Sequence, residues 1–335
     1  MLRVGSHTVR PLFEQLGVKH RGYSKNLQRM IVDFGAESSF AKSAERLWMH
    51  HQLSVSASCI RKITLGHACA IRHLQDPPTT RGALPAQGAE IIVTEMDGSM
   101  LPMVECKAGT QGDRRKSRHC HWQEVRLCAA RVPGQSAAFY GVSGGGSVAE
   151  AGNQWSSTVA KANWGLNTQL HVVCDGASWI HEQCDQCLGK QATFLLDFYH
   201  ACDYLAAATD PAATHKRWFE VQKNRLKTNH PERVLTALEP FLETETTDSS
   251  SAPVRAAYRY LSNRMDQLDY KTAIERGLPI GSGMIEGGHR HVLQNRLKLS
   301  GAWWKKKNVI DMANLRVCRA NNEENQYWQN LKAVA

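Results

Sequence analysis

The sequence lacks any long apolar run. Its longest apolar stretches, such as 91–93 and 204–208, fall far short of the roughly 18 to 20 residues that a membrane-spanning helix needs. The segment 1–15 has neither an apolar core of about 7 to 15 residues nor a small-residue cleavage site, so it does not resemble an export signal. We therefore expect no membrane segment and a cytoplasmic location.

Closely paired cysteines are nearly absent as well. The 10 cysteines are scattered, and the single CxxC spacing, Cys184 to Cys187, has no second pair nearby, unlike a zinc ribbon. Buried thiols in a reducing compartment are the main interpretation, and a zinc or redox role for this pair is the minor one. The crowded residues His119, Cys120 and His121 fit no ligand pattern that we assign, and a metal site there is also a minor alternative.

Acidic residues are too few to balance the basic ones. There are 41 Lys and Arg against 31 Asp and Glu, so the formal net charge is +10, which favours a polyanionic partner and nucleic acid first. A hydrophobic content of 42% is too high for a disordered chain, and a charged content of 21% is too low for a long coiled coil. The length of 335 residues predicts two domains or one elaborated domain.

The amino-terminal part predicts a pair of helices over 38–74. Ser39 and Ser56 are suited to cap them, with a short turn at 53–56 between them. This is a helix-turn-helix pattern, typical of DNA recognition, and an ordinary helical hairpin remains the alternative. The proline-containing stretch 76–88 predicts a linker after this region.

The middle of the chain alternates strands with helices. The run 89–106 predicts a strand, a tight turn at Asp97-Gly98 and a second strand, because Asp-Gly is a common turn dipeptide. Helices are expected near Ser178 and over 199–208, and an exposed acidic loop at 243–253. Further strands are predicted at 124–132, 169–174 and 192–197, and mostly helical structure over 206–275. We therefore expect an α/β sheet flanked by helices, with functional groups at the strand ends.

Three acidic residues share a suggestive context. Asp97 and Asp175 each end an apolar run and precede glycine, while Glu286 follows the GSG of 281–283 at an expected helix start. Mg²⁺ prefers hard oxygen ligands, so these carboxylates together could hold one or two ions that share a substrate phosphate. Each Asp-Gly taken alone is an ordinary turn.

Positive charge gathers near the third acid. The stretch 281–307 holds six Lys and Arg against Glu286, a concentration that suits several backbone phosphates better than a small phosphate ester. Trp303 and Trp304 could stack on an unpaired base or pack in the core, and we expect core packing for at least one of them. The residues expected to contact DNA are Arg114, Arg115, Lys116, Arg118, His289, Arg290, Arg296, Lys298, Trp303, Trp304, Lys305, Lys306 and Lys307.

Four ordered motifs resemble those of a known family. The segments MDGSMLPM (96–103), VVCDGASWI (172–180), LLDFYHACDYLAAA (195–208) and GSGMIEGGHRHVLQNRLKLSGAWW (281–304) look like the DDE transposases of bacterial insertion sequences, most of all the Kra-four type. The resemblance implies an RNase H-like mixed sheet flanked by helices. On this basis we divide the chain into a helical DNA-recognition region (1–75), a linker (76–88), a catalytic domain (89–205 and 276–320) and a helical insertion (206–275).

The resemblance also implies an activity. Asp97, Asp175 and Glu286 would hold two Mg²⁺ ions, with Mn²⁺ able to substitute, and Asp197 with His200 would organise the site. The reaction would be strand cleavage at the element ends and transfer of the 3′-hydroxyl to target DNA. The partner would be double-stranded DNA, of the terminal repeats and of the target, bound by a dimer or higher oligomer at the nucleoid of a bacterial cytoplasm.

Two other functions stay open. The chain could be a catalytically silent or truncated relative that binds DNA and regulates, or a stand-alone RNase H-like nuclease that ignores terminal-repeat sequence. A tyrosine or serine recombinase would instead need an activated nucleophile such as Tyr199 or Ser282.

Overall fold

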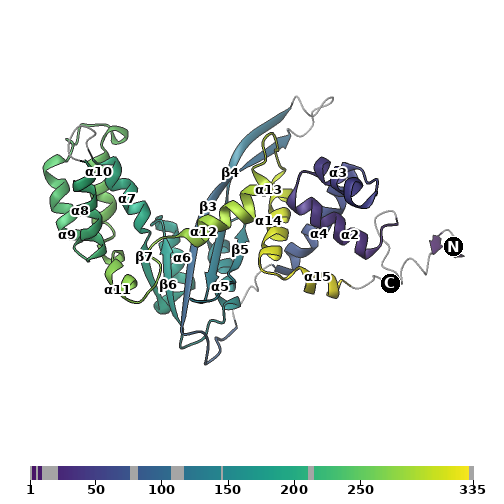
Figure 1. Cartoon of the computed structure of the whole chain (residues 1–335), viewed down its shortest axis with the longest axis horizontal. Helices are drawn as coiled ribbons and strands as arrows, with labels where there is room; N and C mark the ends of the chain where they lie inside the picture. Colours follow the sequence, from purple (N-terminus) through teal and green to yellow (C-terminus); the bar gives the residue numbers. More distant parts are fainter. Residues whose placement is uncertain are drawn as a thin grey trace.

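A five-stranded mixed sheet forms the middle of an elongated molecule (Figure 1). In this computed structural model the described residues are 2–4, 7–9, 22–75, 82–106, 117–144, 146–209 and 215–331. The sheet has the order β5-β4-β3-β6-β7. Its strands are β3 (Ile91–Cys106), β4 (Arg118–Arg131), β5 (Phe139–Ser143), β6 (Gln169–Cys174) and β7 (Ala192–Leu196). β4 runs antiparallel to its neighbours β3 and β5, whereas β6 runs parallel to β3 and β7 runs parallel to β6.

The predicted turn at Asp97-Gly98 is wrong. β3 runs through both residues without a break, with Asp97 opposite Leu127 and Gly98 opposite Arg126 of β4. The long-range ladder gives both residues cross-strand partners, and it overrides the local turn preference of Asp-Gly. Asp97 therefore lies in mid-strand, and the outer halves of β3 and β4 project from the sheet as a two-stranded arm (Figure 1).

Helices cover both faces of the sheet. α5 (Val148–Lys161) and α6 (Ser178–Cys187) pack on one face, where fully buried Trp155 donates its Nε1–H to Thr94 Oγ1 at 2.7 Å. The chain's later segments cross the other face. These are α12 (Gly283–Gly288), a π-helical segment (His289–Gln294), α13 (Asn295–Leu297), α14 (Lys306–Ala320) and, beyond it, α15 (Glu324–Asn330).

Three amino-terminal helices form a bundle. They are α2 (Lys25–Glu37), α3 (Phe40–His51) and α4 (Ala57–Gln75), and of these α2 and α4 pack on α14. The predicted pair of helices and both caps are confirmed, since Ser39 Oγ accepts from Lys42 N and Ser56 Oγ accepts from Cys59 N, each at 3.3 Å. The sequence analysis missed α2, and a further small hairpin joins β1 (Leu2–Val4) to β2 (His7–Val9).

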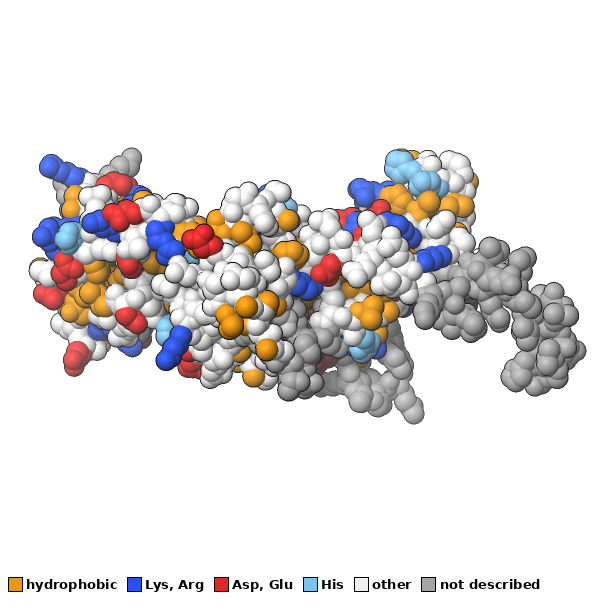
Figure 2. Space-filling view, turned by 90° about the horizontal axis from the view of Figure 1, so that it is seen from below, with side chains coloured by type: hydrophobic (Ala, Val, Ile, Leu, Met, Phe, Trp, Pro, Cys, Tyr) orange, Lys and Arg blue, Asp and Glu red, His pale blue; other side chains and the backbone are white. Residues whose placement is uncertain are grey.

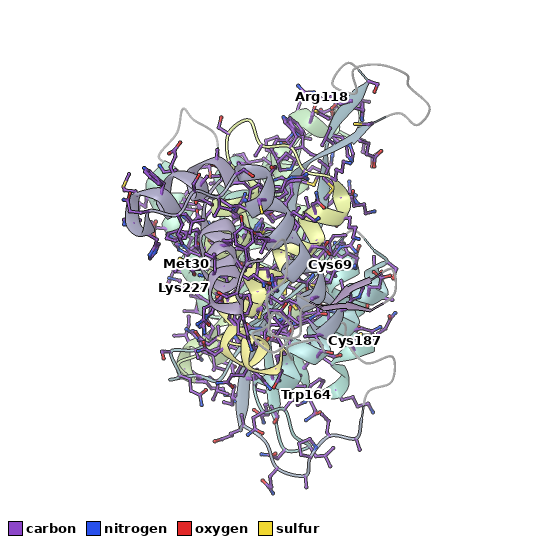
Figure 3. All side chains as sticks on the ribbon, turned by 90° about the vertical axis from the view of Figure 1, so that its right-hand side faces the viewer. Met30, Cys69, Arg118, Trp164, Cys187 and Lys227 are labelled. Carbon is purple, nitrogen blue, oxygen red and sulfur yellow. The ribbon has the colours of Figure 1, made fainter. Side chains whose placement is uncertain are left out.

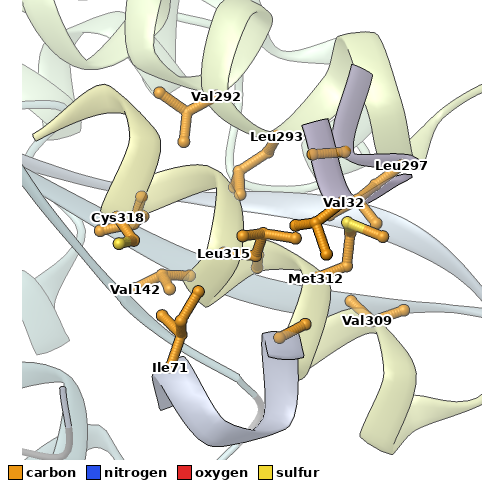
Figure 4. Packing of buried hydrophobic residues seen from close by; sticks show 14 of the residues in the cluster. Val32, Ile71, Val142, Val292, Leu293, Leu297, Val309, Met312, Leu315 and Cys318 are labelled. Carbon is orange, nitrogen blue, oxygen red and sulfur yellow. The ribbon is translucent and has the colours of Figure 1, made fainter. Parts of the chain in front are cut away.

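The amino-terminal helices and the sheet share one hydrophobic core. Val32 of α2 and Ile71 of α4 surround Met312 and Leu315 of α14, and the same cluster reaches Val142 of β5 (Figure 4). Burial of this apolar surface is the main energy that holds the helices to the sheet. The predicted linker between the two regions falls partly outside the described residues, at 76–81.

The described part of 206–275, predicted to be mostly helical, is helical and lies at the opposite end of the molecule from α2–α4 (Figure 1). After α7 (Phe198–Ala207) come α8 (His215–Lys227), α9 (Pro231–Leu238), α10 (Pro253–Ser262) and α11 (Tyr270–Glu275). Short 3-10 turns lie at 189–191, 239–241, 249–251 and 265–267. Its cluster includes Leu226 and Leu261 together with Val173 of β6 and Leu195 of β7, so the insertion packs against the sheet.

Among the described residues, no helix combines the length and the apolar character that crossing a bilayer requires.

The segment that returns from the insertion is held to β6 by a buried histidine. His171 is 7% exposed, and its Nε2–H donates to the carbonyl oxygen of Pro279 at 2.7 Å. Burial lowers the pKa of His171; the contact with Pro279 opposes this shift, and the charge of Arg276 adds to it.

We predict that this histidine makes the fold sensitive to mild acid. Above the ordinary histidine pKa the group is neutral in both states, but below it the unfolded chain binds a proton that the native His171 resists, so stability is lost as the pH falls. The variant H171Q keeps an N–H donor for Pro279 and does not titrate. Urea unfolding between about pH 7.5 and 5.5 should therefore show a larger fall in the free energy of unfolding for the wild type than for H171Q. Parallel falls would contradict the assignment.

Candidate active site

Two of the predicted carboxylates lie on neighbouring inner strands of the sheet, near the carboxyl end of β6. Asp97 lies on β3, and Asp175 directly follows β6, the strand that pairs with β3 in parallel. Asp97 Oδ1 accepts from Gly98 N at 2.6 Å, and Asp175 Oδ1 accepts from Ala177 N at 3.0 Å. Burial raises the pKa of Asp175, and the negative charge of Asp97 adds to that shift, while the bond from Ala177 opposes it. The two carboxylates are thus close enough to repel each other.

The turn that carries Asp175 is held by the helical insertion. The Tyr260 hydroxyl donates to the Asp175 carbonyl oxygen at 2.5 Å, and Arg264 donates to the Gly176 carbonyl from Nε at 3.1 Å and from Nη2 at 2.8 Å. Gly176 has φ 79°, a left-handed conformation that favours glycine. The insertion therefore fixes the backbone of a predicted ligand, a role that the sequence analysis did not assign.

Asp197 joins the point where the chain enters the insertion to the point where it returns. Its side chain is fully buried, and Oδ1 accepts from Tyr199 N at 2.6 Å and from His200 N at 3.0 Å, which caps α7. Oδ2 accepts from Ser282 N at 2.6 Å and from the Ser282 hydroxyl. His200 is exposed, and its charge tends to lower the pKa of Asp175. Asp197 therefore holds the loop that leads into α12.

A buried carboxylate that the sequence analysis missed lies two residues before Asp97. Glu95 is 1% exposed, and its Oε2 accepts from Ile285 N at 2.7 Å. Burial raises the pKa of Glu95 to about 8, and nearby Asp197 raises it further, against the bond from Ile285. An acidic residue inside an apolar strand sequence, IIVTEM, was the signal that could have found it. Glu95 ties β3 to the helix of Glu286.

The third predicted ligand lies on a different element from the first two. Glu286 follows Ile285 in α12, where its side chain is exposed. Within the ranges described, no three His, Cys, Asp or Glu side chains lie close enough together to hold a metal ion. The structure thus brings Asp97 and Asp175 together and places Glu286 on a helix that Glu95 anchors to the same strand.

A histidine expected at the DNA surface instead contacts Asp97. His289 is 5% exposed, and its Nε2 lies 3.2 Å from Asp97 Oδ2. It comes from the π-helical segment that follows α12. Its position beside the carboxylate indicates a positioning role and leaves no surface for a DNA backbone.

Arg296 and Trp304 are also buried. Arg296 is 2% exposed, donates from Nε to the Gly35 carbonyl at 3.0 Å, and lies over the rings of Phe40 and Trp304 at 4.7 and 4.8 Å. Burial lowers the pKa of Arg296 to about 10. Trp304 is 7% exposed, which agrees with the core role expected for at least one of the two tryptophans. Both residues join the amino-terminal helices to the α13–α14 segment.

The remaining predicted DNA contacts divide into two groups. Arg114, Arg115 and Lys116 lie outside the described residues, and Arg118 is exposed at the outer end of the arm (Figure 3). The other exposed members are Arg290, Lys298, Trp303, Lys305, Lys306 and Lys307. At the insertion end, Lys and Arg are interspersed with Asp and Glu on the face shown in Figure 2, so that face carries no stripe of one charge.

Among the described residues, neither the Cys184–Cys187 pair nor the stretch 119–121 belongs to a group of three or more side chains placed to hold a metal ion. Cys184 is buried, and burial raises the pKa of its thiol to about 12. The rings of His119 and His121 stack 5.5 Å apart on β4.

We predict that Asp197 stabilises the fold strongly. Replacing it by alanine removes a helix cap and leaves the buried donors of Ser282 without an acceptor, so D197A should lower the free energy of unfolding by about 3 kcal/mol or more. The matched control is D203A, which removes an exposed carboxylate from the same helix and should change stability by no more than about 0.5 kcal/mol. Urea titration of the three proteins measures both effects, and equal stability of D197A and D203A would contradict the assignment.

Comparison with known proteins gives one family match and a distant structural likeness. No curated protein matches this sequence. A solved structure that matches is the Drosophila P element transposase strand transfer complex, with a TM-score of 0.35 and 9% identity over 96% of this chain and 86% of that chain, a likeness too weak to carry an argument. A model of an uncharacterised protein family, UPF0236, matches residues 154–330, a segment that includes Asp175, Asp197 and Glu286 but not Asp97. Because this match covers more than half of the sequence, the chain belongs to the UPF0236 family.

Proposed function

We propose that the chain is an insertion-sequence transposase of the DDE type, which cleaves DNA strands at element ends and transfers the 3′-hydroxyl to a target. The observation that carries the proposal is that Asp97 and Asp175 lie close together on the neighbouring strands β3 and β6, while Glu286 lies on a helix anchored to β3. The mixed sheet, and the helical insertion between β7 and α12, agree with the RNase H-like arrangement implied by the resemblance to the Kra-four type.

The carboxylates suit a hard divalent cation. Asp97 and Asp175 would hold Mg²⁺, or Mn²⁺ in its place, and Glu286 would complete the set of three, with two ions expected from the resemblance. The pKa of Asp175 is raised mainly by burial, and the negative charge of Asp97 adds to the rise; a bound cation would relieve that repulsion, which supports this assignment. When bound, the ions supply charge neutralisation at the phosphate and lower the pKa of the attacking hydroxyl or water.

The chain's own groups position these carboxylates. His289 contacts Asp97, Tyr260 and Arg264 hold the turn of Asp175, and Glu95 anchors the start of the helix that carries Glu286. At neutral pH Glu95 is protonated, so it adds no negative charge beside the Asp97 carboxylate. Repulsion between negative charges is therefore limited to the carboxylates of the proposed metal site.

The exposed basic residues are proposed to bind the DNA backbone. Arg118, Arg290, Lys298 and 305–307 would each neutralise a phosphate, and α3 with α4 would read the terminal repeats. Two element ends must be brought together, so we expect a dimer or higher oligomer on DNA. We place the protein at the nucleoid of a bacterial cytoplasm.

A covalent recombinase mechanism through Ser282 is disfavoured. Ser282 is 7% exposed, and its hydroxyl donates to Asp197, so its oxygen is not presented to a phosphodiester.

We predict that D175N abolishes metal-dependent cleavage of a labelled element-end duplex, because it removes the charge of one ligand, while duplex binding stays within a few-fold of the wild type. The matched control D185N removes an exposed carboxylate from α6 and should cleave normally. Gel analysis of the products with Mg²⁺, with Mn²⁺ and with chelator makes the measurement.

Each alternative outcome has a distinct meaning. Cleavage by D175N would show that the ligand assignment is wrong. Binding without cleavage by the wild type would indicate a silent DNA-binding regulator. Cleavage without sequence preference would indicate a nuclease.

We also predict that Glu95 acts on the site through Ile285. In E95Q the amide oxygen still accepts from Ile285 N, and the side chain copies the protonated acid, so cleavage should be close to that of the wild type. In E95A the helix start loses its acceptor, and the Mg²⁺ concentration for half-maximal cleavage should rise at least several-fold. Equal metal dependence in E95A and the wild type would exclude this role. Circular dichroism of both variants controls for loss of fold.

A further inference from the structure

Two tryptophans lie exposed and in contact on the arm formed by β3 and β4. Trp122 of β4 is 54% exposed and Trp303, just before α14, is 40% exposed. Their ring centroids lie 6.1 Å apart with an interplanar angle of 65°, an edge-to-face contact. More than half of one indole and much of the other thus remain in water, an unusual position for residues of this size.

The backbone holds both side chains in place. Trp304 N donates to the Pro102 carbonyl at 3.2 Å, and Val104 N donates to the Trp304 carbonyl at 2.8 Å, so residue 304 pairs with the free edge of β3. Trp122 lies directly opposite Pro102 in the β3–β4 ladder. Because the neighbouring Trp304 is buried against Phe40, Trp303 is fixed on the outside of the arm.

The surroundings of the pair are cationic. Lys298 Nζ lies 6.0 Å from the centre of the Trp122 ring, and Arg118 is exposed on the same strand as Trp122. The carboxylate nearest along β4, Glu124, forms an ion pair with Arg126 at 2.9 Å. An aromatic surface beside exposed positive charge matches a nucleotide, which offers a π-face and a phosphate together.

We propose that Trp122, Trp303 and Lys298 form a binding site for an unpaired nucleotide, whose base stacks on the indoles while its phosphate contacts the lysine. The proposal rests on the proposed function in taking DNA as the ligand. The site lies apart from the chemistry: Pro102, which faces Trp122, is five residues beyond Asp97 on β3, roughly 17 Å along the strand. Side chains also alternate between faces, so Trp122 and Asp97 point to opposite sides of the arm.

The test is direct binding of the full chain to a labelled single strand and to the blunt duplex of the same sequence, by fluorescence anisotropy. Stacking on one aromatic residue contributes enough that W122A and W303A should each bind the single strand about 5- to 150-fold more weakly, while duplex affinity changes little. W303F retains an aromatic face and should recover most of the loss. The matched control is F241A, which removes an aromatic side chain of 65% exposure from the insertion and should bind like the wild type.

Specific results would overturn the proposal. Single-strand affinity of W122A and W303A equal to that of F241A would exclude the site. Equal losses for single strand and duplex would show that the backbone alone is bound there. A changed oligomeric state in size-exclusion chromatography, with unchanged single-strand affinity, would identify the pair as a protein interface instead.

The outcome is separable from that of the proposed function. Metal-dependent cleavage of a duplex element end depends on Asp175 and tests the transposase proposal. Selective loss of single-strand binding in the tryptophan variants tests this site whether or not cleavage occurs.

Discussion

The side chain of Asp197 is the contact on which the arrangement of the candidate site depends most. It accepts bonds from the first turn of α7 and from Ser282, residues separated by the whole helical insertion. A backbone bond from Phe198 N to the Ile280 carbonyl at 2.9 Å joins the same two stretches of chain, and the Asp197 carboxylate gives them a buried acceptor that both share. Together these contacts hold the start and the end of a large insertion next to each other.

The two buried acidic side chains beneath α12 differ in their surroundings. Asp197 accepts from both of its flanking segments, so its burial is compensated by several donors. Glu95 accepts a hydrogen bond from Ile285, and there burial dominates and favours the protonated acid. Both side chains hold the backbone before Glu286, but a neutral Glu95 does so without increasing the repulsion between Asp97 and Asp175.

The sequence was sufficient where the signals are local. Serine caps at Ser39 and Ser56, the apolar runs of β6 and β7, and the helical insertion were all predicted, because caps and periodicity act over a few residues. It failed at Asp97-Gly98, where pairing with a distant strand decides the conformation. The candidate site follows the same division: the motifs pointed to Asp97, Asp175 and Glu286, but the contacts that Glu95, Tyr260 and Arg264 make around them depend on the fold.

The exposure of basic side chains was the least predictable property. A basic stretch of sequence indicates charge, yet the packing of α2 and α3 against the later helices decides which members reach water. Arg296 is therefore buried, and His289 is buried beside Asp97 of β3, although their sequence neighbours Arg290 and Lys298 are exposed. Glu95 is the converse case: it lies inside the apolar run IIVTEM, a sign of burial that the search for motifs did not use.

The shared core of the amino-terminal helices and α14 would fix the spacing between a DNA sequence that these helices recognise and the candidate active site. Val32 and Ile71 pack on Met312 in the cluster that continues to the sheet, so α2–α4 are joined to the sheet as one body. If α3 and α4 read a terminal repeat, the distance from the bases they read to the bond at Asp97 and Asp175 is set by protein packing. The molecule would then act as a ruler, in which the cut falls at a constant offset from the recognised sequence, and a one-base-pair insertion between them would move the cut and leave recognition intact.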